Sequence, residues 1–342
     1  MGYRYIGSKA RIADDILKYI GTPLDEDGFF IDAFSGTGIV SEKAADYGWK
    51  IVANDMMKNA IVMTESHLLS VEDIKFKDFG GYGKIIELLN ALEPKKGFIW
   101  KEYSPASLEL IGIERKYFTE TNAMKIDATV SEVHKWHMEK KITDKEFTLL
   151  LSDIISATNN VANIAGTYGC FLSKWTGQAL GDFTLEASRL RDVPVNYETY
   201  MKDVFDIISA ENDLVYLDPP YTKRQYASYY HIPETIVCGD EPVVEGVAGL
   251  RPWKDRASVF CYKTKALSAL IRLILQQKAH RTLLSYSNEG HVKLEDLVLG
   301  LKDYGTVELV ELSTIGRYRP NKAAVDKQSE VQEYLVDFRR NK

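Results

Sequence analysis

A short apolar run that stops at two prolines is the feature that most constrains this chain. Residues 214–217, Leu-Val-Tyr-Leu, are expected to form a buried parallel strand, since they are apolar without alternation. Pro219 and Pro220 follow, and because proline cannot donate a ladder hydrogen bond, the strand has to end there. Asp218 and Tyr221 are left at its carboxyl end. In open α/β sheets ligands bind at this edge, so we expect a site there.

The chemistry of these residues suits a planar ring that bears an amino group. Asp218 and the carbonyl of Pro219 are two acceptors for the hydrogens of an amine, and Tyr221 offers a flat face for stacking. A conjugated amine is a weak nucleophile, and acceptors aimed at its hydrogens stabilise the cation that forms when it attacks. Taken alone, Asp-Pro-Pro-Tyr is equally well explained as a polar turn, so the rest of the chain has to decide.

A nucleotide-binding βαβ unit is indicated near the amino terminus. The expected strand, glycine turn, helix, second strand and acid are residues 29–34, Ser35-Gly36-Thr37-Gly38, residues 39–47, residues 50–54 and Asp55. An acid about 20 residues past the glycines commonly binds ribose hydroxyls. Ser41 occupies the position where a dinucleotide site needs a third glycine or alanine, which argues against a dinucleotide oxidoreductase.

S-adenosylmethionine fits this turn better, because it has an ammonium group and no pyrophosphate. Asp32, at the end of the first strand, is a candidate to serve the ammonium through water or backbone, Lys9 the methionine carboxylate and Asp55 the ribose. Ser8 is placed to cap a helix that ends near Ile20, which would put Lys9 in the first turn of that helix.

The long interval between Asp55 and Asp218 predicts an inserted region, because the remaining strands and helices do not need so many residues. Thr119 opens an amphipathic stretch, and Thr143-Asp144-Lys145-Glu146 is a capping box before a second helix. Residues 159–169 form an expected loop of amides and glycines, which can contact base edges or a phosphate backbone, although a plain surface loop explains them as well.

The carboxyl-terminal part continues the α/β alternation. The expected elements are a strand within residues 195–203, a helix after Asp203-Val204-Phe205, a loop-rich segment at 232–262, a helix at 265–276, a strand at 281–286, a helix at 294–301, and strands at 307–312 and 333–338.

Composition predicts a globular protein of two domains, with 342 residues of which 45% are hydrophobic. The 3 cysteines lack ligand spacing, so we expect no disulfide framework, no metal site and a reduced, cytoplasmic location. No run approaches the roughly 20 apolar residues of a membrane span. The net charge of -6 argues against indiscriminate coating of nucleic acid but leaves basic clusters, Lys223-Arg224, Arg251 to Arg256, and Arg317 to Lys322.

In this order the motifs resemble the adenine-N6 DNA methyltransferases of the alpha arrangement, the Dam-like enzymes with an Asp-Pro-Pro-Tyr motif. The matching residues are Tyr5-Ile6-Gly7-Ser8-Lys9, Asp32 to Gly38, Asp55, Asp203 and Asp218-Pro219-Pro220-Tyr221, with weaker likeness at Tyr117-Phe118-Thr119 and Leu284 to Asn288. Tyr5 is a departure, since the Dam enzymes have tryptophan there. The region between the motifs does not resemble that of Dam, so no target sequence is implied.

The resemblance implies a role for each matching residue. Tyr5 and Lys9 would contact S-adenosylmethionine, Asp55 would hold its ribose, and Asp203 with Val204 would meet its adenine. Its methionine part would lie in the turn formed by Phe34, Ser35, Gly36, Thr37 and Gly38, with Asp32 and Asp218 beside it. Asp218, Pro219, Pro220 and Tyr221 would form the catalytic motif around the target amine.

The expected fold is therefore a Rossmann-like, doubly wound methyltransferase sheet with an inserted, mainly helical DNA target-recognition domain. Residues 1–60 and 195–342 would bind the cofactor, and residues 61–194 would read DNA. The candidate DNA contacts are Asn160, Tyr168, Lys223, Arg224, Tyr230, His231, Arg251 and Lys254.

The expected activity is transfer of the methyl group of S-adenosylmethionine to adenine N6 in double-stranded DNA, after flipping of the base. We expect a monomer that works in a restriction-modification system beside a paired endonuclease, away from membranes. Cytosine N4, an RNA adenine or a glutamine amide are alternative acceptors, and a non-catalytic DNA-binding regulator is an alternative of another class.

Overall fold

The computed structural model describes residues 7–25, 27–312 and 332–341. Tyr5 and the basic cluster Arg317 to Lys322 lie outside the described residues. The chain divides into two compact units. Within the described residues, 7–64, 195–226 and 256–341 form one, which we call the sheet unit, while 65–194 and 227–255 form the other, the helical unit.

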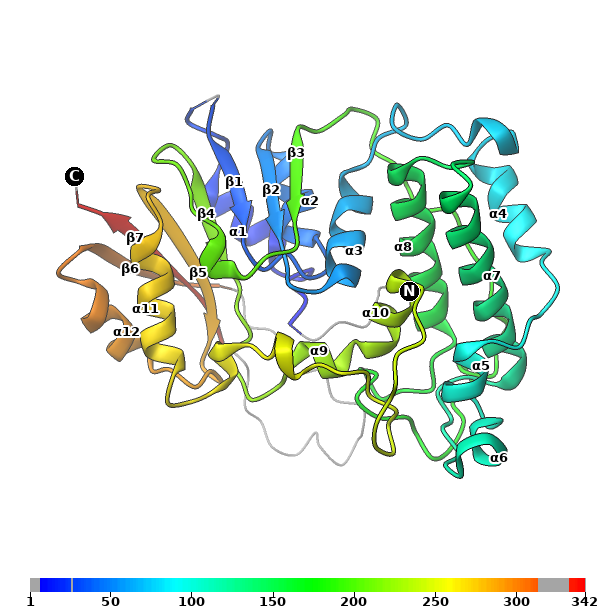
Figure 1. The fold of residues 1–342 in the computed structure, drawn as a ribbon. Helices are drawn as coiled ribbons and strands as arrows, with labels where there is room; N and C mark the ends of the chain where they lie inside the picture. The colour runs from blue at the N-terminus through cyan, green and yellow to red at the C-terminus, as the bar shows by residue number, and fades with distance from the viewer. Residues whose placement is uncertain (1–6, 26, 313–331, 342) are drawn as a thin grey trace. The chain divides into compact units, whose positions relative to one another are not determined.

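The sheet unit contains a seven-stranded sheet of order β3-β2-β1-β4-β5-β7-β6. The strands are β1 (Phe29–Asp32), β2 (Lys50–Asn54), β3 (Tyr197–Tyr200), β4 (Leu214–Leu217), β5 (Arg281–Ser287), β6 (Gly305–Glu311) and β7 (Glu333–Arg340) (Figure 1). β1 to β5 pair in parallel, while β7 lies antiparallel between β5 and β6. This mostly parallel sheet confirms the predicted mixed α/β, Rossmann-like class, and each strand overlaps the segment predicted for it.

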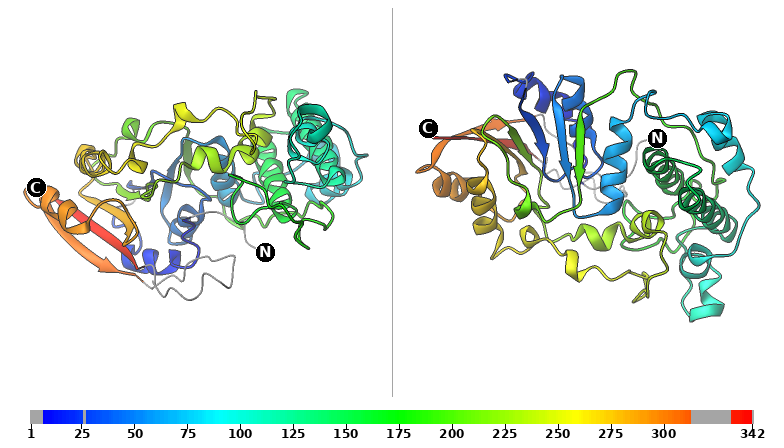
Figure 2. Two further views of the ribbon diagram at one scale, coloured as in Figure 1. Left: turned by 90° about the horizontal axis from the view of Figure 1, so that it is seen from below. Right: turned by 45° about the horizontal axis from the view of Figure 1, so that its top comes forward.

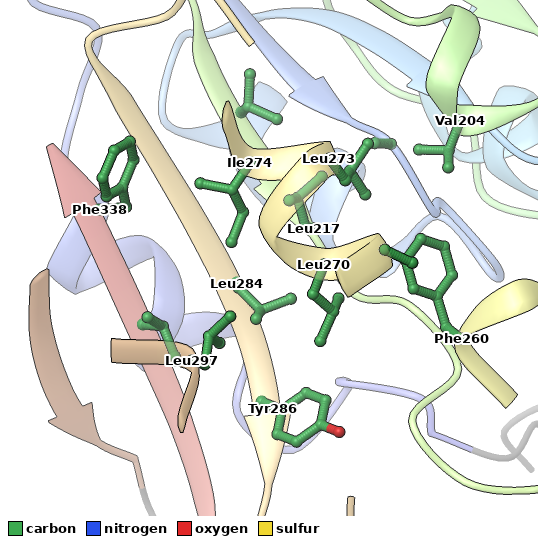
Figure 3. Packing of buried hydrophobic residues seen from close by; sticks show 14 of the residues in the cluster. Val204, Leu217, Phe260, Leu270, Leu273, Ile274, Leu284, Tyr286, Leu297 and Phe338 are labelled. Atoms are coloured by element: carbon green, nitrogen blue, oxygen red, sulfur yellow. The ribbon is translucent and has the colours of Figure 1, made fainter. Parts of the chain in front are cut away.

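Two helices pack on one face of this sheet because alternate strand residues point toward them. Leu217, Leu284 and Phe338 form a buried cluster with α11 (Ala266–Gln276) and α12 (Leu294–Leu301), as Figure 3 shows. The residues labelled in Figure 3 that belong to strands all point to the face of the sheet that α11 and α12 cover. The cluster is the apolar core on this face of the sheet.

The opposite face meets α1 (Ala13–Ile20) and α2 (Ile39–Asp46), and Figure 2 shows α1 and α11 on opposite sides of the sheet. Tyr19 of α1 donates a hydrogen bond to Oδ2 of Asp337 at 2.7 Å. Asp337 also forms an ion pair with Arg281 at 3.0 Å, so odd-numbered residues of β5 and β7 face α1. This alternation decides which side chains reach the site described below.

The named elements of the helical unit are all helices. They are the end of α3 (Lys58–Leu68), η1 (Lys77–Phe79), α4 (Tyr82–Asn90), α5 (Phe98–Tyr103), α6 (Ser107–Ile111), α7 (Glu120–Met138), α8 (Asp144–Asn160), α9 (Tyr226–Tyr229), α10 (His231–Cys238) and η3 (Lys254–Arg256). Thr119 caps α7, and Thr143 with Glu146 forms the predicted capping box of α8. That the helical unit reads DNA stays a prediction.

Three local expectations were wrong. α1 begins at Ala13 and has Ile12 rather than Ser8 at its N-cap, so Lys9 lies before the helix and not in its first turn. A single 3-10 turn, η2 (Val204–Asp206), replaces the helix expected before β4. The segment expected to be loop-rich contains α10, whose first turn accommodates Pro233.

Of the helices in the described ranges, none is both long and apolar enough to cross a membrane.

Core packing predicts a measurable loss of stability when Leu273 of α11 is shortened. Leu273 is 0% exposed, so Leu273→Ala should lower the free energy of unfolding of the sheet unit by about 2–5 kcal/mol. Leu299→Ala on α12, at a site that is 59% exposed, is the matched control and should have little effect. Urea unfolding measures both, and equal losses would contradict the described packing.

Candidate active site

Four acidic residues follow four neighbouring parallel strands at one edge of the sheet. Asp32 ends β1, and Asp55, Asp203 and Asp218 come after β2, β3 and β4. β1 and β4 pair directly, with Asp32 opposite Tyr216. The glycine turn and the Asp-Pro-Pro-Tyr loop therefore leave adjacent strands at the same edge, as expected for parallel strands.

The turn between β1 and α2 is held in a conformation that depends on glycine. Gly36 and Gly38 have φ of 54° and 81°. A Cβ at Gly38 would lie 2.5 Å from Cα of Thr64, so a side chain is excluded by both conformation and space. Thr64 also donates a hydrogen bond to Oγ of Ser35 at 3.0 Å. The turn thus packs against α3 with its backbone close to its neighbours.

Asp32 is a buried carboxylate, 1% exposed, and its two oxygens differ in their hydrogen bonding. Ser41 of α2 donates a hydrogen bond to its Oδ2 at 2.7 Å. Within the described residues, Oδ1 is buried and accepts no hydrogen bond of normal geometry. Burial raises the pKa of Asp32 to about 7, although the Ser41 hydrogen bond lowers it. A cation near Oδ1 would stabilise the ionised form.

Asp55 fixes the turn from the end of β2. Its Oδ2 accepts a hydrogen bond from N–H of Gly36 at 3.1 Å, and its Oδ1 accepts one from N–H of Met57 at 2.9 Å. The side chain of Asn54 links the strand ends, since its Nδ2 donates to the carbonyls of Ala33 and Lys202 at 3.3 and 3.2 Å. These contacts set the spacing between the ends of β1, β2 and β3.

Asp203 is exposed and accepts a hydrogen bond from N–H of Phe205 at 3.0 Å, which caps η2. Phe205 stacks on Phe260 of η4 (Val259–Cys261) with centroids 5.9 Å apart, and Phe34 meets the same ring edge-on at 5.6 Å. Asp203 thus lies beside a group of three phenylalanines. A flat, apolar ring with a polar edge would fit such surroundings.

Asp218 forms an ion pair with Lys9, whose Nζ lies 2.8 Å from Oδ1 of Asp218. Lys9 is 3% exposed and also donates to the carbonyl of Gly7 at 3.4 Å. Burial lowers the pKa of Lys9, but the facing carboxylates outweigh it and keep that pKa above its usual value. Burial raises the pKa of Asp218, and the Lys9 ammonium partly reverses this. The ion pair thus holds the two side chains together inside the sheet unit.

Glu333, the first residue of β7, completes the surroundings of Tyr221. The hydroxyl of Tyr221 donates a hydrogen bond to Oε1 of Glu333 at 3.2 Å, and Oε2 lies 3.9 Å from Nζ of Lys9. Burial raises the pKa of Tyr221 to about 12, so the phenol stays protonated and keeps donating. N–H of His291 donates to the carbonyl of Tyr221 at 3.0 Å, which fixes the backbone after Pro219 and Pro220.

The sequence did not predict the contact that Ser41 makes, or the roles of Asn54 and Glu333 in the site. Ser41 was noted only as the residue in place of a third glycine, and its hydrogen bond to Asp32 was not foreseen. Glu333 carried a usable signal, because an acid that begins an antiparallel strand beside a parallel one lies at the carboxyl edge of the parallel strand.

Lys223 and Arg224 are exposed on the loop that follows Tyr221. The amide of Gln225 holds this loop against the segment before α11, because N–H of Ser258 donates to its Oε1 at 2.8 Å and its Nε2 donates to the carbonyl of Ser258 at 3.3 Å. Sγ of Cys261 also donates to the carbonyl of Arg224 at 3.3 Å. The loop thus presents two cations beside the Asp-Pro-Pro-Tyr motif.

Three predicted DNA contacts need correction, because Tyr168, Tyr230 and His231 are buried at 0%, 1% and 0% exposure. His231 meets the carbonyl of Tyr168 through Nε2 at 2.8 Å. Burial lowers the pKa of His231 to about 3, so it is neutral. These residues pack the helical unit and cannot meet a nucleic acid directly without unfolding it.

Asn160 and Lys254 are exposed in the helical unit. Arg251 already bonds both oxygens of Asp240, at 3.0 and 2.9 Å. Their contact with DNA stays a prediction.

Comparison with known proteins agrees with this geometry. The family model for D12 class N6 adenine-specific DNA methyltransferases matches residues 5–298. The type II methyltransferase M.FokI of Planomicrobium okeanokoites is 33% identical over 341 residues, which is 97% of this chain and 52% of that protein. The type II methyltransferase M.NlaIII of Neisseria lactamica is 30% identical over 312 residues, which is 90% of each chain.

The modification methylase StsI of Streptococcus sanguinis is 29% identical over 344 residues, and the match covers 98% of this chain and 52% of StsI. The chain thus spans about half the length of M.FokI and StsI. The match to the family model includes both the glycine turn and the Asp-Pro-Pro-Tyr loop. The chain therefore belongs to the D12 class N6 adenine-specific DNA methyltransferase family.

Proposed function

We propose that this protein transfers the methyl group of S-adenosylmethionine to the N6 amino group of adenine in double-stranded DNA. The observation that carries the proposal is the position of Asp218, which follows β4 directly beside the turn that leaves β1. A methyl donor held in that turn and an amine held by Asp218 would meet at one edge of the sheet. Family membership supports the same acceptor atom.

The residues at the edge of the sheet fit S-adenosylmethionine. The unbonded Oδ1 of Asp32 suits the ammonium of its methionine part, directly or through water, and the backbone of residues 34–38 would surround that part. Asp55 would bind the ribose hydroxyls with its carboxylate. Asp203 and Val204, beside the phenylalanines, would meet the adenine. Lys9 would contact the cofactor and keep its ion pair with Asp218.

The bound sulfonium supplies an electrophilic methyl group, and the protein orients the amine that attacks it. Asp218 and the carbonyl of Pro219 would accept hydrogen bonds from the two N6 hydrogens, which stabilises the positive charge that develops on nitrogen. Tyr221 would stack on the base and hold its ring. Because adenine is paired and stacked in the duplex, it has to be flipped out before this geometry can form.

DNA binding would use a basic surface on the sheet unit and a recognition surface on the helical unit. Lys223 and Arg224 adjoin the segment that contains Lys263 and Lys265, all four exposed, and Lys265 lies over the ring of Tyr262 at 5.5 Å. Cations near a stacking ring favour contact with phosphates and an unpaired strand. Residues 61–194, which include Asn160, would supply target recognition together with Arg251 and Lys254.

We further propose a monomeric, cytoplasmic protein that modifies DNA beside a paired restriction endonuclease. The type II relatives support the restriction-modification setting. Expression in cells that lack adenine methylation, followed by sequencing that detects modified bases, would identify the site. Methyl groups found only in RNA, on cytosine N4 or in protein would contradict the proposed acceptor, and sequence-specific binding without transfer would favour a regulator.

Replacing Asp218 tests the catalytic assignment. Asp218→Asn keeps the shape but removes the charge, so single-turnover methyl transfer should fall by at least about 10²-fold. Cofactor affinity, measured by calorimetry, should change little. Asp206→Asn, at an exposed acid on η2, is the matched control. Full activity of Asp218→Asn would refute the mechanism.

Asp32 predicts opposite effects on stability and on cofactor binding. Its pKa rises from 3.8 to about 7 in the folded protein, so between these values the unfolded chain loses the proton first and stability falls as pH rises. Without cofactor at about pH 8, the free energy of unfolding of Asp32→Asn should therefore exceed that of the native protein by an amount on the order of 4 kcal/mol. Below about pH 4 the two proteins should be equally stable.

The same Asp32→Asn variant should bind S-adenosylmethionine much more weakly, because it lacks the charge for the ammonium. Urea unfolding across pH and calorimetry at neutral pH measure the two effects. Lower stability at alkaline pH, or unchanged cofactor affinity, would contradict the role of Asp32.

The basic loop predicts salt-dependent DNA binding. Lys223→Ala combined with Arg224→Ala should weaken binding to any duplex and reduce the slope of log affinity against log salt by about 2. Lys278→Ala combined with Lys302→Ala removes two exposed lysines elsewhere on the sheet unit and is the charge-matched control. Fluorescence anisotropy at several salt concentrations measures both slopes, and equal slopes would exclude phosphate contact at residues 223 and 224.

A further inference from the structure

We propose that Glu333 is a positioning residue for methyl transfer: it shares the Lys9 ammonium with Asp218, so that the site keeps a net negative charge, and it fixes the ring of Tyr221. This inference rests on the proposed function, in which Asp218 and Tyr221 hold the target adenine. None of the sequence motifs of the site includes Glu333.

The sheet topology explains how a residue so late in the chain reaches the site. β7 runs antiparallel to β5, and Glu333 pairs with Ser287 at the carboxyl end of β5. That end lies at the same edge as the end of β4, because β4 and β5 are parallel. Glu333 and Asp337 share the face of the sheet that packs against α1. Lys9, in the segment that leads into α1, approaches Glu333 from that face.

The charge count gives Glu333 its function. Lys9 lies 2.8 Å from Asp218, and a one-to-one pair would cancel the negative charge that Asp218 needs to stabilise a cationic amine. A second carboxylate 3.9 Å from the same ammonium changes the balance to one cation and two anions. Both carboxylates then share Lys9, and one net negative charge remains beside the position proposed for the amine.

The burial of Glu333 supports an electrostatic rather than a solvent-facing role. It is 4% exposed, and no described residue hydrogen-bonds its Oε2. The charged and titratable groups that face it are Lys9, Asp218, Tyr221 and Glu289. A buried carboxylate with an unfilled oxygen is costly unless a charge compensates it, and Lys9 is the cation that does so.

Glu333 also acts on Tyr221. Its Oε1 accepts the hydrogen bond from the Tyr221 hydroxyl at 3.2 Å, while Tyr286 packs against the ring at 5.3 Å between centroids. The two contacts restrict both the tilt and the direction of the ring. A ring fixed in this way presents one face for stacking without having to be ordered when the base arrives.

Two substitutions separate charge from hydrogen bonding. Glu333→Gln keeps an acceptor for Tyr221 but removes the charge, whereas Glu333→Asp keeps the charge on a shorter side chain. Single-turnover methyl transfer to an adenine-containing duplex should fall by about 10²-fold in Glu333→Gln and recover in part in Glu333→Asp. Half-saturating concentrations of cofactor and DNA should stay nearly constant. Glu311→Gln on β6, at an exposed position, is the control.

Wild-type turnover by Glu333→Gln, or a larger loss in Glu333→Asp than in Glu333→Gln, would overturn the charge argument. A second measurement uses the folded protein without DNA or cofactor. Carboxyl-carbon NMR, assigned with Glu333→Gln and Asp218→Asn, should show both carboxyl groups ionised at about pH 7.5. A protonated Glu333 there would overturn the inference even if the enzyme methylates DNA. Ionised groups without any adenine methylation would instead contradict the proposed function alone.

Discussion

The parallel pairing of β1 with β4 is the constraint on which the site depends. β1 and β4 are far apart in the sequence, yet their parallel direction brings the residues after each strand to the same edge. The glycine turn supplies backbone and the Asp-Pro-Pro-Tyr loop supplies acceptors. Neither loop contains all the parts needed for methyl transfer. The proposed chemistry therefore depends on two separate segments that end side by side.

Much of this fold was predictable because local patterns and tertiary structure agree. Apolar runs such as residues 214–217 predict buried strands, and the Thr143–Glu146 box predicts a helix start that the structure contains. The failures have physical reasons. Ser8 resembles a cap, but Lys9 has to reach Asp218, so the helix starts later. His231 and Tyr168 were expected to contact DNA, yet both are buried inside the helical unit, where Nε2 of His231 meets the backbone carbonyl of Tyr168.

The proposed catalytic motif is recognisable from its residue types, whereas its electrostatic surroundings are not. Asp218 and Tyr221 can be recognised in the sequence because the carboxylate, the two prolines and the ring are contiguous. The partners Lys9 and Glu333 come from opposite ends of the described chain, and only the sheet order brings them together. Asp32 and Ser41 are close in sequence, but their hydrogen bond depends on how α2 packs on β1. Contacts that depend on tertiary packing are difficult to predict from a sequence pattern.

The position of β7 between β5 and β6 has a consequence for biosynthesis. A ribosome delivers the amino-terminal segments first, and these can begin to fold while the remainder is still being made. The sheet cannot close around β5 until residues 333–340 have emerged. Lys9 and Asp218 are therefore left without Glu333 until the residues of β7 have been synthesised. Until then a nascent chain would hold Asp218 in an incomplete electrostatic setting, so the surroundings of the proposed catalytic motif are complete only after β7 has joined the sheet.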